Sequence, residues 1–392
     1  VARGGGMAGL SIHPPLEIQL QPTPPGASEV QEPQALLGLR GLTNLGNTCF
    51  MSCVLQIFMH CPPMARFFLS DRHNRFECMA RSLHDPSSGR HHVCLACEMD
   101  LLFSQCFSGA AAAFSPHSFL HTMWLSSDRF AGYEQQDAHE FFIAALAAIY
   151  DGLRRPANER RLTMESKRAR LVASSSSDLQ AVFHGSMRSD VICARCGGRS
   201  TTMEDFTDIS LDLPLSTTAS SEGSCVAKDC SLEQCLHSFT RVEQLGADER
   251  CTCTSCGGLQ DSAKQLSIHK LPHVLCVHLK RFKGDYKSNQ GKSSKLDGVV
   301  KFPLHSLDMS PHTAAHICAD NAASKELIAS NLYDLFGAAV HHGTMQNGHY
   351  TAYVRHQAHW FHCDDSCIYA VPESAVRACS AYMLFYVQKR LN

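Results

Sequence analysis

The sequence has no long apolar run and almost no net charge. None of its apolar stretches approaches the roughly 20 residues that a membrane-spanning helix needs. A formal net charge of −2 at pH 7 gives no reason to expect direct DNA binding by the body of the protein. A secretory signal pattern and an internal repeat are also missing from it. We therefore expect a non-repetitive intracellular protein without a membrane anchor.

Cysteine, by contrast, is abundant, with 20 among 392 residues. A high cysteine content is typical of short secreted domains that depend on disulfides. Here several cysteines form C-x-x-C pairs, a spacing that suits a metal ion better than a disulfide framework. At 44% apolar residues, the chain can bury a full core in one large domain or two small ones. The composition predicts a reduced, metal-binding globular protein.

The pattern of residues changes along the chain. Residues 1–38 are rich in Pro, Gly and Gln and read as a flexible lead-in. Helical spacing of apolar residues dominates from Gly41 to Tyr150, and alternation typical of strands dominates from Val182 onward. This order predicts an α+β fold, with the helices first in the chain.

Between the two halves lies a basic insertion, residues 154–178, which is rich in Arg, Lys and Ser and has no apolar face. Three interpretations remain open for it: a solvated linker, a nuclear-import patch, or a contact to DNA or to an acidic histone surface.

Two C-x-x-C knuckles, each followed by two glycines, predict a structural zinc site. Four thiolates from two such turns can surround one ion tetrahedrally. The ligands expected at this site are Cys193, Cys196, Cys253 and Cys256.

A second zinc site is expected around a third knuckle, Cys94-x-x-Cys97. Cys78 and His73 lie upstream and would complete a Cys₃His set. We favour His73 as the fourth ligand, although the intervening loop contains three further histidines: His84, His91 and His92.

Cys49 is the candidate nucleophile. It follows a glycine- and asparagine-containing turn and opens a stretch with helical apolar spacing, which places it in the first turn of a helix. The unpaired N–H groups and the helix dipole at that position favour a thiolate over a thiol.

A histidine and an acidic residue far along the chain complete a catalytic set. His349 follows a glycine at the head of an alternating strand, and Asp364 and Asp365 follow shortly after. A thiol, an imidazole and a carboxylate in this order are the parts of a papain-like triad. The sequence alone does not separate Asp364 from Asp365 as the residue that orients the histidine.

Four ordered motifs make the chain resemble the ubiquitin-specific protease family. They are Gly41–Gln56, Gly132–Phe141, Leu271–Phe282 and the pair His342–Tyr353 with Trp360–Asp365. The likeness extends from about Leu39 to Tyr386. It is greatest to the deubiquitinase subunit of the SAGA transcriptional coactivator, particularly around Cys94–Met99, Gly132–Phe141 and Asp364–Asp365.

The resemblance implies a papain-like fold with thumb, fingers and palm subdomains. The catalytic domain would cover residues 39–390, with the thumb at about 39–153, the zinc-binding fingers at about 182–268 and the palm at about 269–390. The first zinc ion would lie at the tip of the fingers, and SAGA-type relatives carry a second in the region of Cys94.

The resemblance also implies roles for particular residues. Asn44 corresponds to the side chain that binds the oxyanion, together with a backbone N–H near Cys49. Asp137 and Glu140 would pair with arginines in the ubiquitin tail. Gly343 and Gly348 would keep the channel near His349 narrow enough to exclude side chains at the scissile glycines.

The implied activity is hydrolysis of the isopeptide bond between ubiquitin and a substrate lysine. For a SAGA-type enzyme the expected partners are monoubiquitinated histone in chromatin and small adaptor subunits, and the expected location is the nucleus. Two alternatives remain: a catalytically silent ubiquitin-binding scaffold, and a protease for a ubiquitin-like modifier.

Overall fold

We describe the fold from a computed structural model, which defines residues 37–78, 93–154, 179–216, 226–284, 293–318, 331–344 and 347–389. These residues all belong to one unit, which begins at Leu36. Three predicted features lie outside the described residues: almost all of the lead-in, the basic insertion from residue 155, and the three loop histidines. The structure does not test the predictions made for them.

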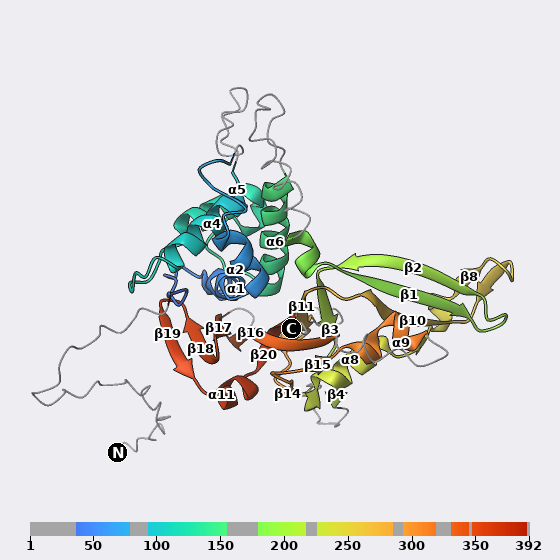
Figure 1. The fold of residues 1–392 in the computed structure, drawn as a ribbon. Coiled ribbons are helices and arrows are strands. Elements are labelled where there is room, and N and C mark those ends of the chain that lie inside the picture. Colours follow the sequence, from blue (N-terminus) through green and yellow to red (C-terminus); the bar gives the residue numbers. More distant parts are fainter. Residues whose placement is uncertain are drawn as a thin grey trace, which may run out of the picture. The chain divides into compact units, whose positions relative to one another are not determined.

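Among the described residues, five α-helices lie between Cys49 and Arg154 (Figure 1). All eleven residues of α1 are buried, because the other helices cover it on one side and strands cover it on the other. Phe50 of α1 packs edge-on against Phe141 of α6, with ring centroids 5.2 Å apart. The helices are α1 (Cys49–Met59), α2 (Pro62–Leu69), α4 (Leu95–Cys106), α5 (His117–Ser126) and α6 (Ala138–Arg154), with the 3₁₀ turn η1 (Asp128–Phe130).

An eight-stranded sheet lies beneath these helices (Figure 1). Its order is β19-β18-β17-β16-β20-β11-β3, with β15 paired to β16, and only β11 and β3 run parallel. The strands are β3 (Asp208–Leu211), β11 (Val274–Leu279), β15 (Leu307–Asp308), β16 (Leu332–Gly343), β17 (Gly348–His356), β18 (His359–Asp364), β19 (Cys367–Val371) and β20 (Ala381–Gln388).

The large sheet separates two hydrophobic clusters. In β11, Val274 and Cys276 belong to the cluster under the helices, whereas Leu275 and Val277 belong to the cluster on the opposite face. This follows from the two-residue period of a strand. A strand buried on both faces has a continuous apolar sequence. This explains why apolar and polar residues do not alternate in β20.

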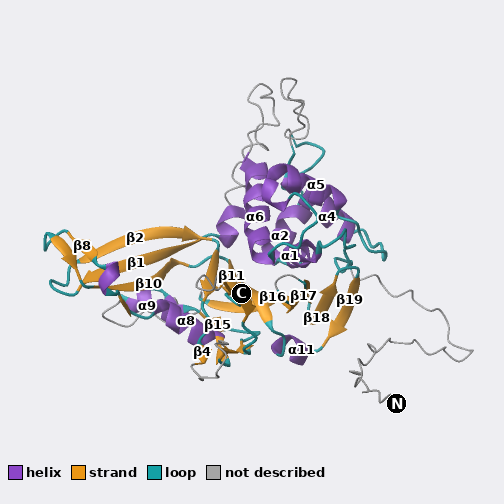
Figure 2. Cartoon of the chain, turned by 180° about the vertical axis from the view of Figure 1, so that it is seen from behind, coloured by secondary structure: helices purple, strands orange, loops and turns teal. Residues whose placement is uncertain are grey.

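A smaller sheet of order β2-β1-β10-β7 extends away from the helices (Figure 2). Its strands are β1 (Gly185–Cys193), β2 (Arg199–Phe206), β7 (Glu243–Gln244) and β10 (Ser262–Lys270). Seven of the eight β2 residues are exposed, so apolar burial gives this sheet little support. The hairpin of β8 (Cys251–Cys253) and β9 (Gly258–Gln260) continues it.

Short elements complete the described fold. The remaining helices are α8 (Leu232–Thr240), α9 (Ala314–Ile317), α11 (Glu373–Arg377), η2 (Ala247–Glu249) and η3 (Ser310–His312). The remaining strand pairs are β4 (Leu215–Ser216) with β5 (Val226–Ala227), β6 (Cys230–Ser231) with β14 (Val300–Lys301), and β12 (Phe282–Gly284) with β13 (Ser293–Lys295). No helix within the described ranges is both long and apolar enough to cross a membrane. The mixed α and β content agrees with the predicted class.

Candidate active site

The loop before α1 is held in place by the side chain of Asn44. Its Oδ1 accepts hydrogen bonds from the backbone N–H groups of Gly46, at 3.0 Å, and Thr48, at 3.2 Å. Gly46 has a φ of 101°, a conformation that favours glycine. The asparagine therefore fixes the turn that delivers Cys49 to the first position of α1, as the sequence predicted.

The Cys49 thiol is buried, with 4% of the residue exposed. Burial raises the pKa of this thiol; the backbone N–H of Tyr350 lowers it in part, and the charge of Asp365 raises it further. As expected, backbone N–H groups at the start of the helix, those of Cys49 and Phe50, lower this pKa, but desolvation outweighs them and the net shift favours the thiol. Within the described part of the chain, no hydrogen bond joins the thiol to His349, so a thiolate must form by proton transfer when the two groups approach.

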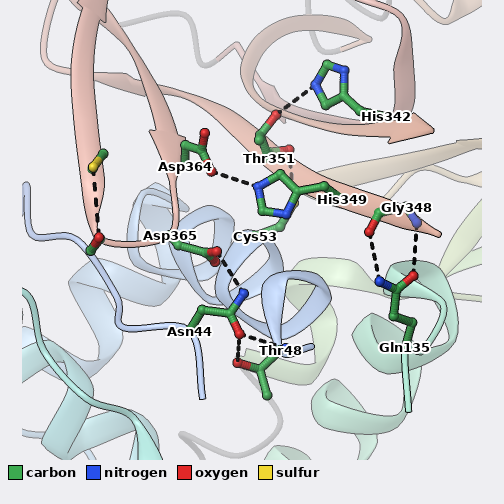
Figure 3. Close-up of polar contacts among 12 residues, drawn as sticks. Asn44, Thr48, Cys53, Gln135, His342, Gly348, His349, Thr351, Asp364 and Asp365 are labelled. Carbon is green, nitrogen blue, oxygen red and sulfur yellow. Dashed lines mark hydrogen bonds and ion pairs between the residues drawn. The ribbon is translucent and has the colours of Figure 1, made fainter. Parts of the chain in front are cut away.

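His349 lies near the start of β17, above the N-terminus of α1 (Figure 3). Its Nε2 is 2.7 Å from Oδ1 of Asp364, the last residue of the neighbouring strand β18. An imidazole that donates Nε2–H to this carboxylate keeps Nδ1 free to accept a proton. Asp364 therefore holds His349 in the tautomer that a general base needs.

Asp365, the next residue, binds a different group. Its Oδ2 accepts a hydrogen bond from Nδ2 of Asn44 at 2.8 Å, and its backbone carbonyl accepts from Leu42 N–H at 2.8 Å. Asp365 has a φ of 48°, and this turn directs the two consecutive carboxylates to different partners. The geometry thus separates the two aspartates that the sequence left as alternatives.

Two glycines permit close backbone approach around the site. A Cβ on Gly41 would lie 2.1 Å from the carbonyl oxygen of Ser366, so only glycine lets this segment reach the Asp365 turn. A Cβ on Gly348 would lie 2.0 Å from Nε2 of His341. The sequence interpretation assigned Gly348 to channel width; its visible role is packing against His341, and the channel width stays a prediction.

Asp137 and Glu140 lie at the start of α6, and both already have partners within the chain. Asp137 Oδ1 accepts from the backbone N–H groups of His139 and Glu140, at 2.7 and 3.0 Å, which caps the helix. Tyr382 O–H donates to the other oxygen of Asp137, and Arg129 pairs with Glu140. Both acids also line a cavity of about 220 Å³.

The first predicted cysteine cluster comes together at the far end of the smaller sheet. Sγ–Sγ separations are 3.9 Å for Cys193–Cys256 and 3.6 Å for Cys196–Cys253. Ligands of a tetrahedral ion with Zn–S bonds of about 2.3 Å lie roughly 3.8 Å apart. The four sulfurs therefore have the spacing that zinc requires.

The second predicted cluster also assembles, between α2 and α4. The ligand atoms of His73, Cys78, Cys94 and Cys97 all lie within 4.8 Å of one another, and His73 Nε2 is 3.2 Å from the sulfur of Cys97. The donor set and spacing fit a Cys₃His zinc site with His73 as the fourth ligand.

A third group, which the sequence did not reveal, joins α6 to β3 and β11. His139 Nε2 is 2.9 Å from Oδ2 of Asp208, and the rings of His139 and His278 stack 3.9 Å apart at 13°. Parallel rings cannot point their in-plane lone pairs at one ion. Burial would raise the pKa of Asp208, but hydrogen bonds from His139 and Ser210 hold it below its ordinary value. We interpret the group as a polar link between helix and sheet.

Comparison with known proteins identifies the family to which the chain is similar. A family model described as ubiquitin carboxyl-terminal hydrolase matches residues 40–386. Ubiquitin C-terminal hydrolase 22 of Arabidopsis thaliana is 37% identical over 90% of this chain and 64% of the relative. Human ubiquitin carboxyl-terminal hydrolase 22 is 40% identical over 91% of this chain and 67% of the relative. The chain thus spans about two thirds of these curated relatives.

The chain is also similar to solved structures of ubiquitin-bound enzymes. The SAGA Ubp8/Sgf11/Sus1/Sgf73 DUB module bound to ubiquitin aldehyde contains a chain that matches this one with a TM-score of 0.68 and 29% identity. The match covers 92% of this chain and 72% of the other. The same module with a cysteine-to-alanine variant of Ubp8, bound to monoubiquitin, matches with a TM-score of 0.66.

Proposed function

The chain belongs to the ubiquitin carboxyl-terminal hydrolase family, and from this premise we propose that it is a thiol-dependent deubiquitinase. The bond it hydrolyses joins the C-terminal glycine of ubiquitin to a substrate lysine. The observation that carries the proposal is that α1, which begins with Cys49, packs against β17, where Asp364 binds His349, while Asp365 binds Asn44 of the loop before Cys49.

The reaction follows from these contacts. His349 Nδ1 takes the proton of the Cys49 thiol, and the thiolate attacks the carbonyl carbon of the terminal glycine. The Asn44 amide and a backbone N–H stabilise the oxyanion, a contribution of about 2.7–4 kcal/mol in comparable sites. The imidazolium then protonates the leaving lysine amine. Water, deprotonated by His349, finally hydrolyses the thioester and releases ubiquitin.

Asp364→Asn and Asp365→Asn are expected to have different effects, because the two carboxylates bind different groups. Asp364→Asn puts an amide where the carboxylate was; its NH₂ can face His349 and select the wrong tautomer, and the amide carries no charge to stabilise the imidazolium, so kcat should fall roughly 10²–10⁴-fold. Asp365→Asn keeps an acceptor oxygen for Asn44 and removes a charge that adds to burial in raising the pKa of Cys49. Cys49 should then ionise at lower pH.

These effects can be measured as kcat on a ubiquitin–fluorophore conjugate and as the pH profile of Cys49 alkylation by iodoacetamide, followed by mass spectrometry. We expect the large loss of kcat in Asp364→Asn and the downward shift of the alkylation profile in Asp365→Asn. The reverse pattern, or equal effects, would show that the division of roles is wrong.

For substrate recognition we propose that Asp137 and Glu140 bind basic side chains in the tail of ubiquitin. Both line the cavity at the start of α6, and the pairing of Glu140 with Arg129 shows that this carboxylate accepts a guanidinium. A ubiquitin arginine would replace Arg129 as the partner of Glu140.

We further propose two structural zinc ions and the thumb, fingers and palm arrangement of the family. The two ligand clusters with zinc-like spacing support the metal sites. The helical layer would be the thumb, the smaller sheet with the Cys193 cluster the fingers, and the large sheet the palm. The zinc ions hold the knuckles together and take no part in the reaction.

The substrate and partners are proposed from the relatives. SAGA DUB modules with Sgf11, Sus1 and Sgf73 are the solved assemblies that match this chain. We therefore propose that small adaptor subunits of this type bind the chain, that it is nuclear, and that monoubiquitinated histone in chromatin is its substrate. Adaptors would bring Cys49 and His349 together, since the described residues of the free chain show no hydrogen bond between them.

The test is a reaction with ubiquitin carrying a thiol-reactive group at its C-terminus, with and without adaptor subunits. An adduct that peptide mapping locates at Cys49 supports the proposal, and labelling only with adaptors adds that the free site is misaligned. Ubiquitin binding without an adduct under either condition would favour the silent scaffold. The same reaction is carried out with probes made from ubiquitin-like modifiers. If one of these probes labels Cys49 faster than the ubiquitin probe does, that modifier is the substrate.

A further inference from the structure

A short segment, Tyr133–Gln135, lies between the two halves of the proposed active site. On one side, Asn47 Nδ2 of the cysteine loop donates to the backbone carbonyl of Tyr133 at 2.9 Å. On the other side, the Gln135 side chain forms two hydrogen bonds with the backbone of Gly348, the residue before His349 (Figure 3). One short segment thus contacts the cysteine loop through its backbone and the histidine strand through the Gln135 side chain.

The contact between Gln135 and Gly348 is bidentate. Gln135 Nε2 donates to the Gly348 carbonyl at 3.0 Å, and Gly348 N–H donates to Gln135 Oε1, also at 3.0 Å. In an antiparallel sheet the N–H and C=O of one residue point to the same side. Gly348 pairs across from Gly343 of β16, and the paired register of β18 begins only at Ala352. The glutamine amide therefore takes the place of a neighbouring strand where β18 no longer reaches.

The position of Gly348 is also restricted from another side. A side chain there would collide with the His341 ring, as the 2.0 Å approach shows. The Gln135 amide thus holds the peptide of Gly348, and the His341 ring leaves room for no side chain at that position. Because His349 is the next residue, the orientation of this peptide sets the starting direction of the catalytic side chain.

The direction of the His349 side chain matters because no hydrogen bond joins this imidazole to the Cys49 thiol in the described part of the chain. The Cys49 sulfur is close to the backbone N–H of Tyr350, which follows His349. A small shift of this backbone therefore changes how often Nδ1 of His349 meets the thiol. Errors of about 1 Å in such geometry can reduce rates 10²-fold.

We propose that Gln135 is a positioning residue, which holds the Gly348 peptide so that His349 can accept the proton of Cys49. The inference rests on the proposed roles of Cys49 and His349. It assigns Gln135 no contact with reacting atoms. Its amide acts through the backbone of Gly348 alone.

The test compares Gln135→Ala and Gln135→Glu with the control Glu134→Ala. Glu134 is the exposed neighbour and forms no hydrogen bond or ion pair with any residue that the structure describes. The first measurement is the rate of iodoacetamide alkylation at Cys49 between pH 5.5 and 8.5, read by mass spectrometry. The second is kcat and KM on a ubiquitin–fluorophore conjugate, with adaptors present.

Gln135→Ala should lower alkylation at neutral pH and kcat by about 10-fold or more, with KM changed less than about 3-fold. Gln135→Glu keeps the size of the side chain and the acceptor for the Gly348 N–H, but its carboxylate lacks the donor for the Gly348 carbonyl. An exposed glutamate, with an ordinary pKa of about 4.3, stays ionised across this pH range. Its loss of alkylation and kcat should therefore lie between those of the wild type and Gln135→Ala from pH 5.5 to 8.5.

Wild-type alkylation and kcat in Gln135→Ala would overturn the proposal, and so would a loss confined to KM, which would place Gln135 in ubiquitin binding. A Gln135→Glu variant with wild-type alkylation and kcat would also contradict it, because the donor to the Gly348 carbonyl would then be dispensable. If the wild type is alkylated at Cys49 but releases no fluorophore, the proposed function fails, while the alkylation series still decides the role of Gln135.

Discussion

Cys49→Ala is expected to abolish hydrolysis of ubiquitin conjugates, with kcat reduced on the order of 10⁶-fold, as for other nucleophiles of catalytic triads. The reason is chemical: alanine cannot form the thioester, and the described residues place no second thiol at the head of α1 beside His349. Binding of ubiquitin should remain, because the tail contacts proposed for Asp137 and Glu140 lie on another helix. Fluorophore release and equilibrium binding of ubiquitin, measured on the same preparation, check both parts.

Cys53→Ser is the matched control. Cys53 lies one helical turn further along α1, and its sulfur is 3.3 Å from the carbonyl oxygen of Thr351. A serine hydroxyl can make the same hydrogen bond, so the variant should fold and retain activity. Residual hydrolysis by Cys49→Ala above about a thousandth of the wild-type rate would show that another group is the nucleophile.

The sequence predicted which residues belong to this site better than it predicted the contacts between them. Residue type and spacing identified Cys49, His349 and the cysteine knuckles, because a nucleophile at a helix start and a C-x-x-C turn are local patterns. The fourth ligand chosen for the second cluster, His73, is also the one that lies beside Cys97. The family resemblance added Asn44, whose turn-forming and amide contacts are now visible.

Other features depend on contacts between distant segments. Asp364 and Asp365 become distinct only through the pairing of β17 with β18 and the turn at Asp365. Gln135 and Gly348 are 213 residues apart, and no local pattern predicts that they meet. The raised pKa of Cys49 arises from packing around α1, which desolvates the thiol more than a helix start can offset. These features are properties of the folded chain, so spacing in the sequence could not supply them.

Loss of the first cysteine cluster is expected to unfold the end of the smaller sheet. The knuckles that carry Cys193 and Cys253 turn through Gly197 and Gly257, with φ of 71° and 72°, and each closes with a backbone hydrogen bond of 2.9 Å. Around them, β2 is almost wholly exposed and the β8–β9 hairpin is only partly covered. Apolar burial therefore contributes little to the stability of this end, and the proposed zinc ion would supply most of it.

Cys256→Ala should therefore remove the dominant stabilising interaction of this region and leave the second cysteine cluster intact. Structural zinc in small domains contributes about 10–16 kcal/mol of binding free energy at neutral pH. Amide hydrogen exchange should lose protection in β1, β2, β8, β9 and β10, whereas α1 and α6, which pack in a separate core, should keep theirs. Zinc content should fall from two ions per chain to one in Cys256→Ala.

Cys251→Ala is the control for that experiment. Cys251 precedes the knuckle by two residues, but its sulfur lies 3.6 Å from the Glu249 carbonyl oxygen and outside the group of four. The variant should keep both zinc ions and the protection of the sheet. If Cys256→Ala also kept two zinc ions per chain and the protection of the sheet, binding of zinc by four thiolates would be refuted. Equal loss in the two variants would mean that any cysteine substitution unfolds this hairpin, and the stability would then come from packing instead of from the ion.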